Sequence, residues 1–501
     1  MELIWNEINA VELILRETTQ TQLEGAVPPP DGRTVRELPD YTAEVFVSSC
    51  RTDAGRLDIE GRITAELVAA DDSGELYSFI SESAFTHTLS NEALEPGMPA
   101  DVIPSLTALS IRRAPDGRLL LSAVIDLDCM VTSARPIRAI GGVNGAPDME
   151  LKTREVPTRT RTELGNAVIR LSDEIASSGA DTVLSSGVQL SVRDTAFENG
   201  GVTVSGMAAV TVLAKSADGE LLQIIRNLPF RESVQTDGAA DEVFALVRLN
   251  ESSVRALGTE FSLISFEADA EIRVFGLRKT ALQLPLDAFS PTINFDCVRK
   301  KTLLLSSLGG ADSQHTVREN VSVPDGMADI FAALSVSARP IATNVGVAGG
   351  ELTVEGLLPT RLVYRSDGGR IGAFSEDVPF AIRMAAPNGA DTARLRMGCS
   401  CSVTGGSGRA AQITYSIGCA AEFWSTEPAE LVVGLAERNG QAQTGGDPFV
   451  PEAFTGMIIH TVGPDEDAFD IAKRFRLPTA RVKELNPDQP FSEGSKVLLV
   501  L

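Results

Sequence analysis

The sequence contains few of the residues on which many enzyme mechanisms depend. Among 501 residues there are three histidines, His87, His315 and His460, and they lie far apart in the chain. None of them occurs in a nucleophile-elbow or HExxH-type context, so Ser–His or Cys–His catalysis would need groups from different domains. We therefore expect no catalytic residues and no enzyme, and we interpret the histidines as surface or loop residues.

Cysteine is also scarce. The six cysteines are too few and too scattered for a disulfide framework, which favours a reducing compartment; they are Cys50, Cys129, Cys297, Cys399, Cys401 and Cys419. Cys399 and Cys401 would share a strand face, with Cys419 on the partner strand, and three thiolates could hold zinc. A fourth cysteine or a local histidine is missing, and small buried cysteines are common in cores. We expect no metal and no cofactor.

Basic charge and long apolar runs are lacking as well. The 44 lysines and arginines face 68 acids, and the net charge of -24 disfavours nucleic acid and anionic lipid as partners. No stretch approaches the roughly 18 continuous apolar residues of a spanning helix. The first 20 residues carry acids and no basic segment before an apolar run, unlike a secretory signal. We expect a cytoplasmic protein without a membrane span.

What the sequence does contain is one pattern in three copies. In each copy a glycine is followed 13 positions later by a second glycine and 24 positions later by a phenylalanine; the three sets are Gly61, Gly74 and Phe85, then Gly206, Gly219 and Phe230, then Gly356, Gly369 and Phe380. The first glycines lie 145 and 150 residues apart. That interval is the size of a domain and is too long for a solenoid unit.

The residues around each first glycine alternate as in a half-buried strand. One parity is mostly apolar in every copy: Leu57, Ile59, Ile63, Ala65 and Leu67; Val202, Val204, Ala208, Val210 and Val212; Leu352, Val354, Leu358, Thr360 and Leu362. A polar turn rich in glycine and aspartate follows, as in a tight hairpin. The second strand ends at Pro229-Phe230 and Pro379-Phe380, whereas the first copy has Ala84 before Phe85. Pro359 cannot donate to a ladder, so we expect its strand at an edge or bulged there.

These patterns predict a mainly β protein with three repeated, sandwich-like β-rich domains. We place the repeats at 1–148, 149–295 and 296–438 and an exposed Gly-, Gln- and Pro-rich linker at 439–456. Further hairpins are expected around 115–117 and 405–408, and the segment 162–181, which could pass for a helix, is interpreted as mostly strand and loop. The glycines at 405–408 form a hairpin tip and not a phosphate loop.

In the last segment, 457–501, the spacing of the apolar residues changes from the period of strands to that of helices. A short strand precedes apolar residues at helical spacing, with Asp465, Glu466 and Asp467 placed to cap the first helix. Pro478 suits the start of a second helix, Asn486-Pro487 ends it, and a strand closes the segment. The predicted order is β-α-α-β.

This segment resembles a LysM domain. The matching positions are Val462, Pro464, Asp470-Ile471-Ala472-Lys473-Arg474-Phe475, Leu485-Asn486-Pro487, Gly494 and Val497-Leu498-Leu499-Val500. The resemblance implies a groove between the loop before the first helix and the loop after the second, which in LysM domains commonly binds N-acetylglucosamine-containing glycans. The groove residues would be Pro464, Asp465, Glu466, Asp467, Asn486, Pro487 and Phe491. In place of the family's Gly-Asp-Thr-Leu this chain has Asp465-Glu466-Asp467-Ala468.

The three repeats followed by such a module resemble SipL-like spore-envelope proteins of endospore-forming bacteria, in which a domain of unknown function precedes a C-terminal LysM. That resemblance implies a non-enzymatic scaffold in spore coat assembly, located in the mother-cell cytoplasm at the forespore surface and bound to a coat morphogenetic ATPase. The alternative is a peptidoglycan-binding cell-wall protein, and an unrecognised hydrolase is a third reading.

The module is nearly neutral, with seven acids and six bases in 456–501, and we predict that it recognises a protein rather than a sugar. The acids would face a basic partner residue; the alternative is that they only cap a helix.

Overall fold

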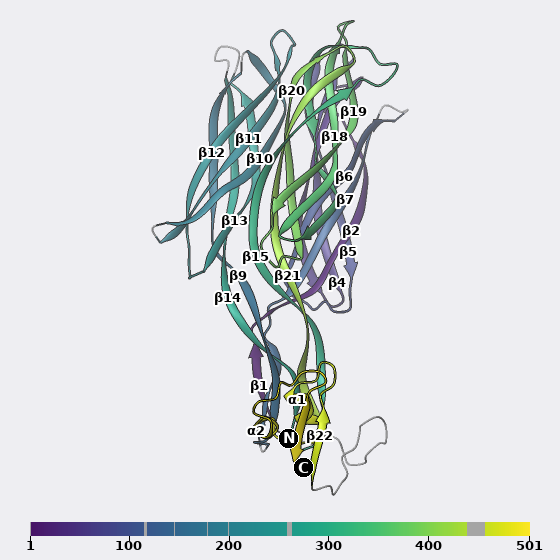
Figure 1. The fold of residues 1–501 in the computed structure, drawn as a ribbon. Helices are drawn as coiled ribbons and strands as arrows, with labels where there is room; N and C mark the ends of the chain where they lie inside the picture. Colours follow the sequence, from purple (N-terminus) through teal and green to yellow (C-terminus); the bar gives the residue numbers. More distant parts are fainter. Residues whose placement is uncertain are drawn as a thin grey trace.

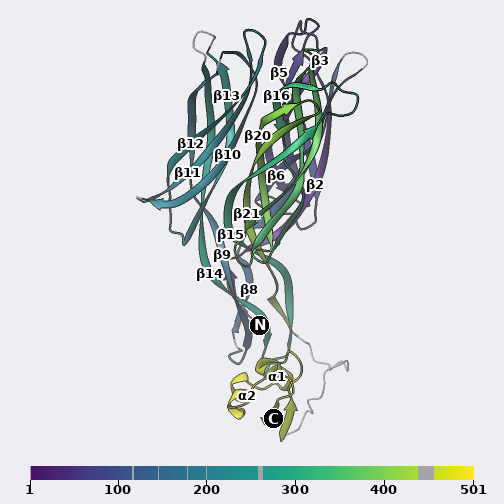
Figure 2. The ribbon, with the colours of Figure 1, turned by 45° about the horizontal axis from the view of Figure 1, so that its top comes forward.

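A computed structural model describes residues 2–114, 118–144, 146–177, 179–198, 200–257, 263–437 and 456–500. The protein is mainly β, with two short helices near the end of the described chain. The predicted linker at 439–456 falls almost entirely outside the described residues, as does the predicted turn at 115–117. Figure 1 shows a broad β body that narrows into a stem, with the helical segment at the narrow end, and Figure 2 shows the same order from another side. Among the described residues no helix is long and apolar enough to cross a membrane.

The first third of the chain forms two three-stranded sheets, β3-β4-β5 and β2-β7-β6, and the paired strands β1 and β8. The strands are β1 (Glu2–Ile8), β2 (Val11–Val27), β3 (Glu37–Asp53), β4 (Arg56–Ala70), β5 (Leu76–Ser90), β6 (Ala100–Arg113), β7 (Leu119–Ser133) and β8 (Ile137–Asn144). The inner faces of the two sheets share one apolar core. We refer to these two sheets as unit 1.

The second third, unit 2, contains the sheets β10-β11-β12 and β13-β14-β9. Its strands are β9 (Glu150–Ala176), β10 (Ala180–Glu198), β11 (Gly201–Ser216), β12 (Leu221–Gln235), β13 (Glu242–Ala256) and β14 (Leu263–Phe289). The prediction that the segment 162–181 is strand and loop is confirmed, because β9 runs through most of it. The first strand again pairs with the last, and the last with the strand before it.

Unit 3 has the same strand order, except that its second strand is split in two. Its strands are β15 (Phe295–Ser322), β16 (Ile330–Ala338), β17 (Ile341–Ala348), β18 (Glu351–Ser366), β19 (Ile371–Ala385), β20 (Thr392–Ser407) and β21 (Ala410–Glu437). The pairs Leu304–Glu12 and Leu305–Val11 join β15 to β2, so the sheets β2-β7-β6 and β20-β21-β15 form one six-stranded sheet.

The repeated sequence pattern corresponds to a hairpin in each unit, β4–β5, β11–β12 and β18–β19. In every hairpin the first glycine pairs with the phenylalanine on the neighbouring strand: Gly61 with Phe85, Gly206 with Phe230 and Gly356 with Phe380. A methyl group added at Gly206 would lie 2.2 Å from the Phe230 ring and 2.3 Å from the Ser191 carbonyl. The glycine is therefore needed because the ring and the adjacent strand occupy the space of a side chain.

The phenylalanines and the alternating apolar residues of the pattern are buried in all three hairpins. Phe85, Phe230 and Phe380 are 5%, 8% and 6% exposed. The alternating residues that we expected on the inner face are all buried, including the polar Thr360, whose hydroxyl lies 3.1 Å from that of Tyr415. The turn glycines Gly74, Gly219 and Gly369 have positive φ. The prediction of tight turns at these positions is therefore correct.

Two local expectations need correction. Pro359 lies on β18, which is the central strand of its sheet and pairs regularly with β19. The proline is tolerated because the strand on its other side is interrupted between Ala338 and Ile341, where β16 ends and β17 begins. The hairpin β20–β21 turns at Gly408 and Arg409, whereas Gly405 and Gly406 still belong to the ladder.

The stem consists of β1–β8 and the lower ends of the β9–β14 and β15–β21 pairs. These three ribbons pack their apolar side chains together, and the buried members are Ile8, Ala10, Ile137, Ala139, Val156, Leu282, Leu284, Leu304, Ala429 and Leu431. Beyond the stem lies the segment that we call the terminal module, with β22 (Met457–Thr461), α1 (Ala468–Phe475), α2 (Thr479–Leu485) and β23 (Lys496–Val500). The predicted β-α-α-β order is confirmed, and β22 pairs antiparallel with β23.

Candidate functional site

The loop before α1 in the terminal module contains the acids predicted to line a binding groove. Asp467 is the N-cap of α1: its carboxylate accepts from the N–H groups of Phe469 at 2.8 Å and Asp470 at 3.0 Å. The Asp470 side chain accepts in return from the Asp467 N–H at 3.1 Å, which completes a capping box. The reading in which an acid of this loop caps the helix therefore holds for Asp467.

Glu466 is engaged inside the module. Its carboxylate accepts from the Gly463 N–H at 2.9 Å, lies 2.7 Å from His460 Nε2 and pairs with Arg474 at 2.9 Å. Burial alone would raise the pKa of Glu466, but the hydrogen bonds from the Gly463 N–H and His460 lower it by more, so the pKa lies below its ordinary value. This carboxylate holds the loop to β22 and α1.

The same face of the module is bound to the stem. Lys152 on β9 lies 2.9 Å from both the Asp467 and the Asp470 carboxylates. Burial lowers the pKa of Lys152, but its hydrogen bonds to the two carboxylates raise it by more. The basic group facing the acidic loop thus comes from this chain.

Three further contacts complete the docking of the module. Lys473 on α1 pairs with Asp287 on β14 at 2.6 Å. The Thr479 N–H, at the start of α2, donates to the Glu150 carboxylate at 2.9 Å. The ring of Phe289 meets that of Phe469 edge to face, with the centroids 5.0 Å apart, and joins the core of the module. Polar and apolar contacts together fix the module against the end of the stem.

The second predicted loop contains one structural residue and two exposed prolines. The Asn486 amide donates to the carbonyls of Val482 and Leu498, both at 2.8 Å, and accepts from the Leu498 N–H at 2.7 Å. It is buried and links the end of α2 to β23. Pro487 and Pro490 are exposed, and Phe491 packs at the edge of the module core.

Of the seven predicted groove residues, three make structural bonds and four do not. Glu466, Asp467 and Asn486 hold the module together or attach it to the stem. Pro464, Asp465, Pro487 and Phe491 make no side-chain hydrogen bond or ion pair among the described residues, and no such bond joins the loop 464–467 to the loop 486–491. Asp465 is exposed and has φ 56°, a conformation that aspartate and asparagine tolerate.

Sequence reasoning missed a second group of polar residues, which joins the three units. Arg394 on β20 of unit 3 is 1% exposed and reaches into unit 1. Its Nε donates to the Asp128 carboxylate at 3.0 Å, its Nη2 donates to the Asp128 carbonyl at 2.8 Å, and Nη1 pairs with Asp101. Burial raises the pKa of Asp101, but Arg394 more than compensates and the pKa is lowered. All polar atoms of a buried guanidinium are thus used to join β20 to β6 and β7.

A similar network joins unit 2 to unit 3 around Glu422, which is 2% exposed on β21. Arg161 on β9 donates to one carboxylate oxygen at 2.7 Å, and Arg396 donates to the other at 2.6 Å. The Arg161 guanidinium also lies 4.6 Å from the Phe275 ring centroid and 4.9 Å from that of Trp424.

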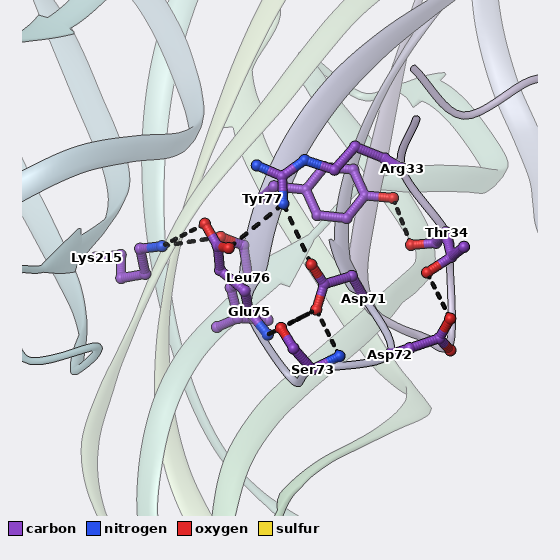
Figure 3. A network of polar contacts seen from close by, with 9 residues as sticks. All are labelled: Arg33, Thr34, Asp71, Asp72, Ser73, Glu75, Leu76, Tyr77 and Lys215. Atoms are coloured by element: carbon purple, nitrogen blue, oxygen red, sulfur yellow. Dashed lines mark hydrogen bonds and ion pairs between the residues drawn. The ribbon is translucent and has the colours of Figure 1, made fainter. Parts of the chain in front are cut away.

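The contact between units 1 and 2 lies next to the turn that contains Asp71 and Asp72 (Figure 3). Asp71 accepts from the N–H groups of Ser73 at 2.9 Å and Glu75 at 3.0 Å, as expected for aspartate in a turn. Lys215 from β11 of unit 2 reaches the Leu76 carbonyl at 3.0 Å. The Asp71-Asp72 pair therefore belongs to a structural turn at the junction between two units.

A cavity of about 1190 Å³, lined by both polar and apolar side chains, lies between the units. Segments of edge strands from all three units line it: 40–47, 101–109, 185–192, 246–249, 335–347 and 391–401. The side chain of Gln189 on β10 lies over Gly398 and Gly418, and a side chain at either glycine would crowd it.

Two half-buried carboxylates bind the edge of β10 beside this cavity. Glu66 of unit 1 accepts from the Ser186 N–H at 3.2 Å, and Asp312 of unit 3 accepts from the Val192 N–H at 2.8 Å. Burial, together with the nearby Glu44 and Asp40, raises the pKa of Glu66 to about 7 although the Ser186 N–H lowers it; burial raises the pKa of Asp312 to about 6. Both groups titrate near neutral pH at the junction of units.

These shifts predict a pH-dependent stability. Because the folded-state pKa of Glu66 is raised, its protonated form favours folding, and its contribution is lost as the pH rises through about 7. We expect Glu66→Gln to raise the free energy of unfolding at pH 8 by about 1 to 3 kcal/mol and to change it little at pH 5. Urea unfolding at both pH values measures this, with the exposed Glu82→Gln as control. A variant less stable than the wild type at pH 8 would contradict the prediction.

The histidines and most of the cysteines have hydrogen-bond partners nearby. His87 lies 2.9 Å from the Thr19 hydroxyl, and His315 lies 3.0 Å from that of Ser313. The Cys401 thiol donates to the Val336 carbonyl at 3.3 Å. Burial raises the pKa of Cys419 to about 12. Within the described ranges no three His, Cys, Asp or Glu side chains are grouped in a way that could hold a metal ion.

Comparison of the chain with protein-family models, with curated proteins and with solved structures found no match.

Proposed function

We propose that this protein is a non-enzymatic scaffold of bacterial spore coat assembly, made of three copies of one β-rich domain and a LysM-like terminal module. Support for the three copies comes from the common strand order of the units and from the Gly–Phe pair in each central hairpin. Support for the module comes from its β-α-α-β order and from the positions that resemble LysM.

The observation that carries the proposal is the division of the molecule into a β body, whose units are joined by the buried Arg394 and Glu422, and a module docked at its far end. Arg394 joins unit 3 to unit 1, and Glu422 joins unit 3 to unit 2 through Arg161, which is the arrangement that a scaffold needs. We propose that the partner is a coat morphogenetic ATPase, with the complex at the forespore surface in the mother cell. Purification of the tagged chain from sporulating cells tests this; recovery of cell-wall glycan without the ATPase would favour the peptidoglycan-binding alternative.

The module can be tested through Asp465, the one acid of the loop 465–467 that has no partner among the residues that the structure describes. We expect Asp465→Asn in the full chain to weaken ATPase binding about three- to tenfold, since it removes a carboxylate available to a basic partner residue while asparagine keeps the positive φ. Glu484→Gln, an exposed acid on α2, is the matched control and should bind as the wild type does. Calorimetric titration measures both, and equal affinity of the wild type and Asp465→Asn would contradict the role of this acid.

A further inference from the structure

Strand β5 is an outer edge of unit 1, because among the described strands it pairs with β4 alone. The direction of its backbone groups follows from two bonds at its start. The Glu75 carbonyl accepts from the Asp71 N–H of the same hairpin, at 3.1 Å, whereas the Leu76 carbonyl accepts from Lys215, which approaches from unit 2 (Figure 3). In an antiparallel strand both backbone groups of a residue point to the same side. Even-numbered residues of β5 therefore present their N–H and C=O groups away from β4.

The equivalent edges of the other two units are blocked at one matching position. Pro229 on β12 pairs with Met207, and Pro379 on β19 pairs with Leu357, both in a regular register. In these two units the even-numbered residues face the neighbouring strand of the hairpin, because the Glu220 carbonyl accepts from the Ser216 N–H and the Arg370 carbonyl accepts from the Ser366 N–H. The odd-numbered Pro229 and Pro379 therefore have their nitrogens on the outer edge. A proline there offers no donor to an added strand, which is one of the ways in which proteins protect sheet edges.

The first unit lacks this protection. Ala84 occupies the matching position, opposite Arg62, and keeps its outward N–H. From 78 to 90 the strand contains no proline, lysine or arginine, the residues that commonly discourage edge pairing. The even-numbered side chains from Ile80 to Thr88 are all exposed, and Ile80 is 64% exposed. This edge is long, unpaired and partly apolar.

We propose that the outer edge of β5 binds an extended segment of a partner protein, which adds to the sheet as a further strand. The segment would pair with the outward backbone groups of residues 80–88 and place β-branched apolar side chains beside Ile80 and Ala84. It would carry a basic residue beside Glu82, which within the described ranges accepts a single bond, from the Thr64 hydroxyl at 3.4 Å. The net charge of -24 favours a basic segment over an acidic one.

A second copy of this chain fits the edge less well. Antiparallel pairing of two β5 strands about Glu82 would set like charges directly opposite each other, which is unfavourable. Each copy also brings a net charge of -24 to the contact. The inference is independent of the proposed function, because it depends on β5 of unit 1 and not on the terminal module.

The chain itself supplies the variant that tests this inference. Ala84→Pro should leave the fold intact, since β12 and β19 carry proline at the same position, and it removes one outward N–H. The probe is a capped, fluorescent peptide that alternates lysine and valine, titrated into the full chain by anisotropy. We expect saturable binding by the wild type, at least tenfold weaker binding by Ala84→Pro and binding within twofold of the wild type by Ala84→Ser, which keeps the N–H.

Amide hydrogen exchange adds a readout at the edge. With bound peptide, the even-numbered amides from Ile80 to Thr88 should exchange more slowly in the wild type and not in Ala84→Pro, while thermal unfolding shows that the variant is folded. Equal peptide affinity of Ala84→Pro and the wild type, or no saturable binding by the wild type, would overturn the inference. A wild-type dimer that Ala84→Pro separates would assign the edge to a second copy and would also overturn it.

Discussion

Replacing Arg394 with methionine is expected to lower the free energy of unfolding by about 3 kcal/mol, near the low end for a broken buried ion pair. The guanidinium is fully buried between units 1 and 3, and its loss leaves Asp101, Asp128 and two carbonyls without their donor. The cost stays at the low end because the Asp101 and Asp128 side chains are 44% and 27% exposed and water can solvate them. Urea unfolding at neutral pH and constant salt measures the effect.

A neighbouring arginine provides the control. Arg396 lies on the same strand with a 40% exposed side chain, and Glu422 keeps Arg161 when Arg396 is removed. We expect Arg396→Met to cost about 1 kcal/mol or less. Adding Asp101→Asn and Asp128→Asn to Arg394→Met should recover part of the loss, because the unpaired charges are then removed. An Arg394→Met protein as stable as the wild type would show that this residue does not hold the units together.

Truncation of Phe230 to alanine is expected to cost about 3 to 5 kcal/mol, the usual range for a buried phenylalanine. Its ring lies over Gly206 in the core of unit 2, so the truncation leaves a cavity beside a residue without a side chain. Denaturant unfolding of the full chain measures the loss.

Phe197→Ala is the matched comparison. That ring is on β10 of the same unit and is 50% exposed, so its removal should cost less than about 1 kcal/mol. Similar losses in the two variants would contradict the assignment of the Gly–Phe pair to the core.

The hairpins could be predicted because their geometry is local. Gly61 and Phe85 lie at equal distances from Ser73 in the turn, so a regular antiparallel ladder must place them opposite each other. The same arithmetic applies to the other two copies. The period-two pattern likewise fixes which face of each strand is apolar, and that pattern depends only on neighbouring residues.

The joining of the units could not be predicted in this way. Arg394 is separated from Asp128 by 266 residues and from Asp101 by 293, and no periodicity links such positions. The expectation for Pro359 was wrong for the same reason: whether a proline is tolerated depends on the strand beside it, and here that strand is interrupted.

The terminal module contains one contact that could be predicted from the sequence and one that could not. The cap formed by Asp467 and Asp470 follows from their spacing at the start of a helix, which the sequence contains. Lys152, which binds the same two acids, comes from more than three hundred positions earlier and gave no signal in the sequence. The acidic loop therefore has an intramolecular basic partner that its local sequence does not indicate.

The most direct test of the proposed scaffold is a comparison of two ligands for the full chain. Calorimetric titration with a purified coat morphogenetic ATPase and with a chitooligosaccharide should give saturable binding of the ATPase and no measurable binding of the sugar. Tight binding of the sugar without binding of the ATPase would contradict the account.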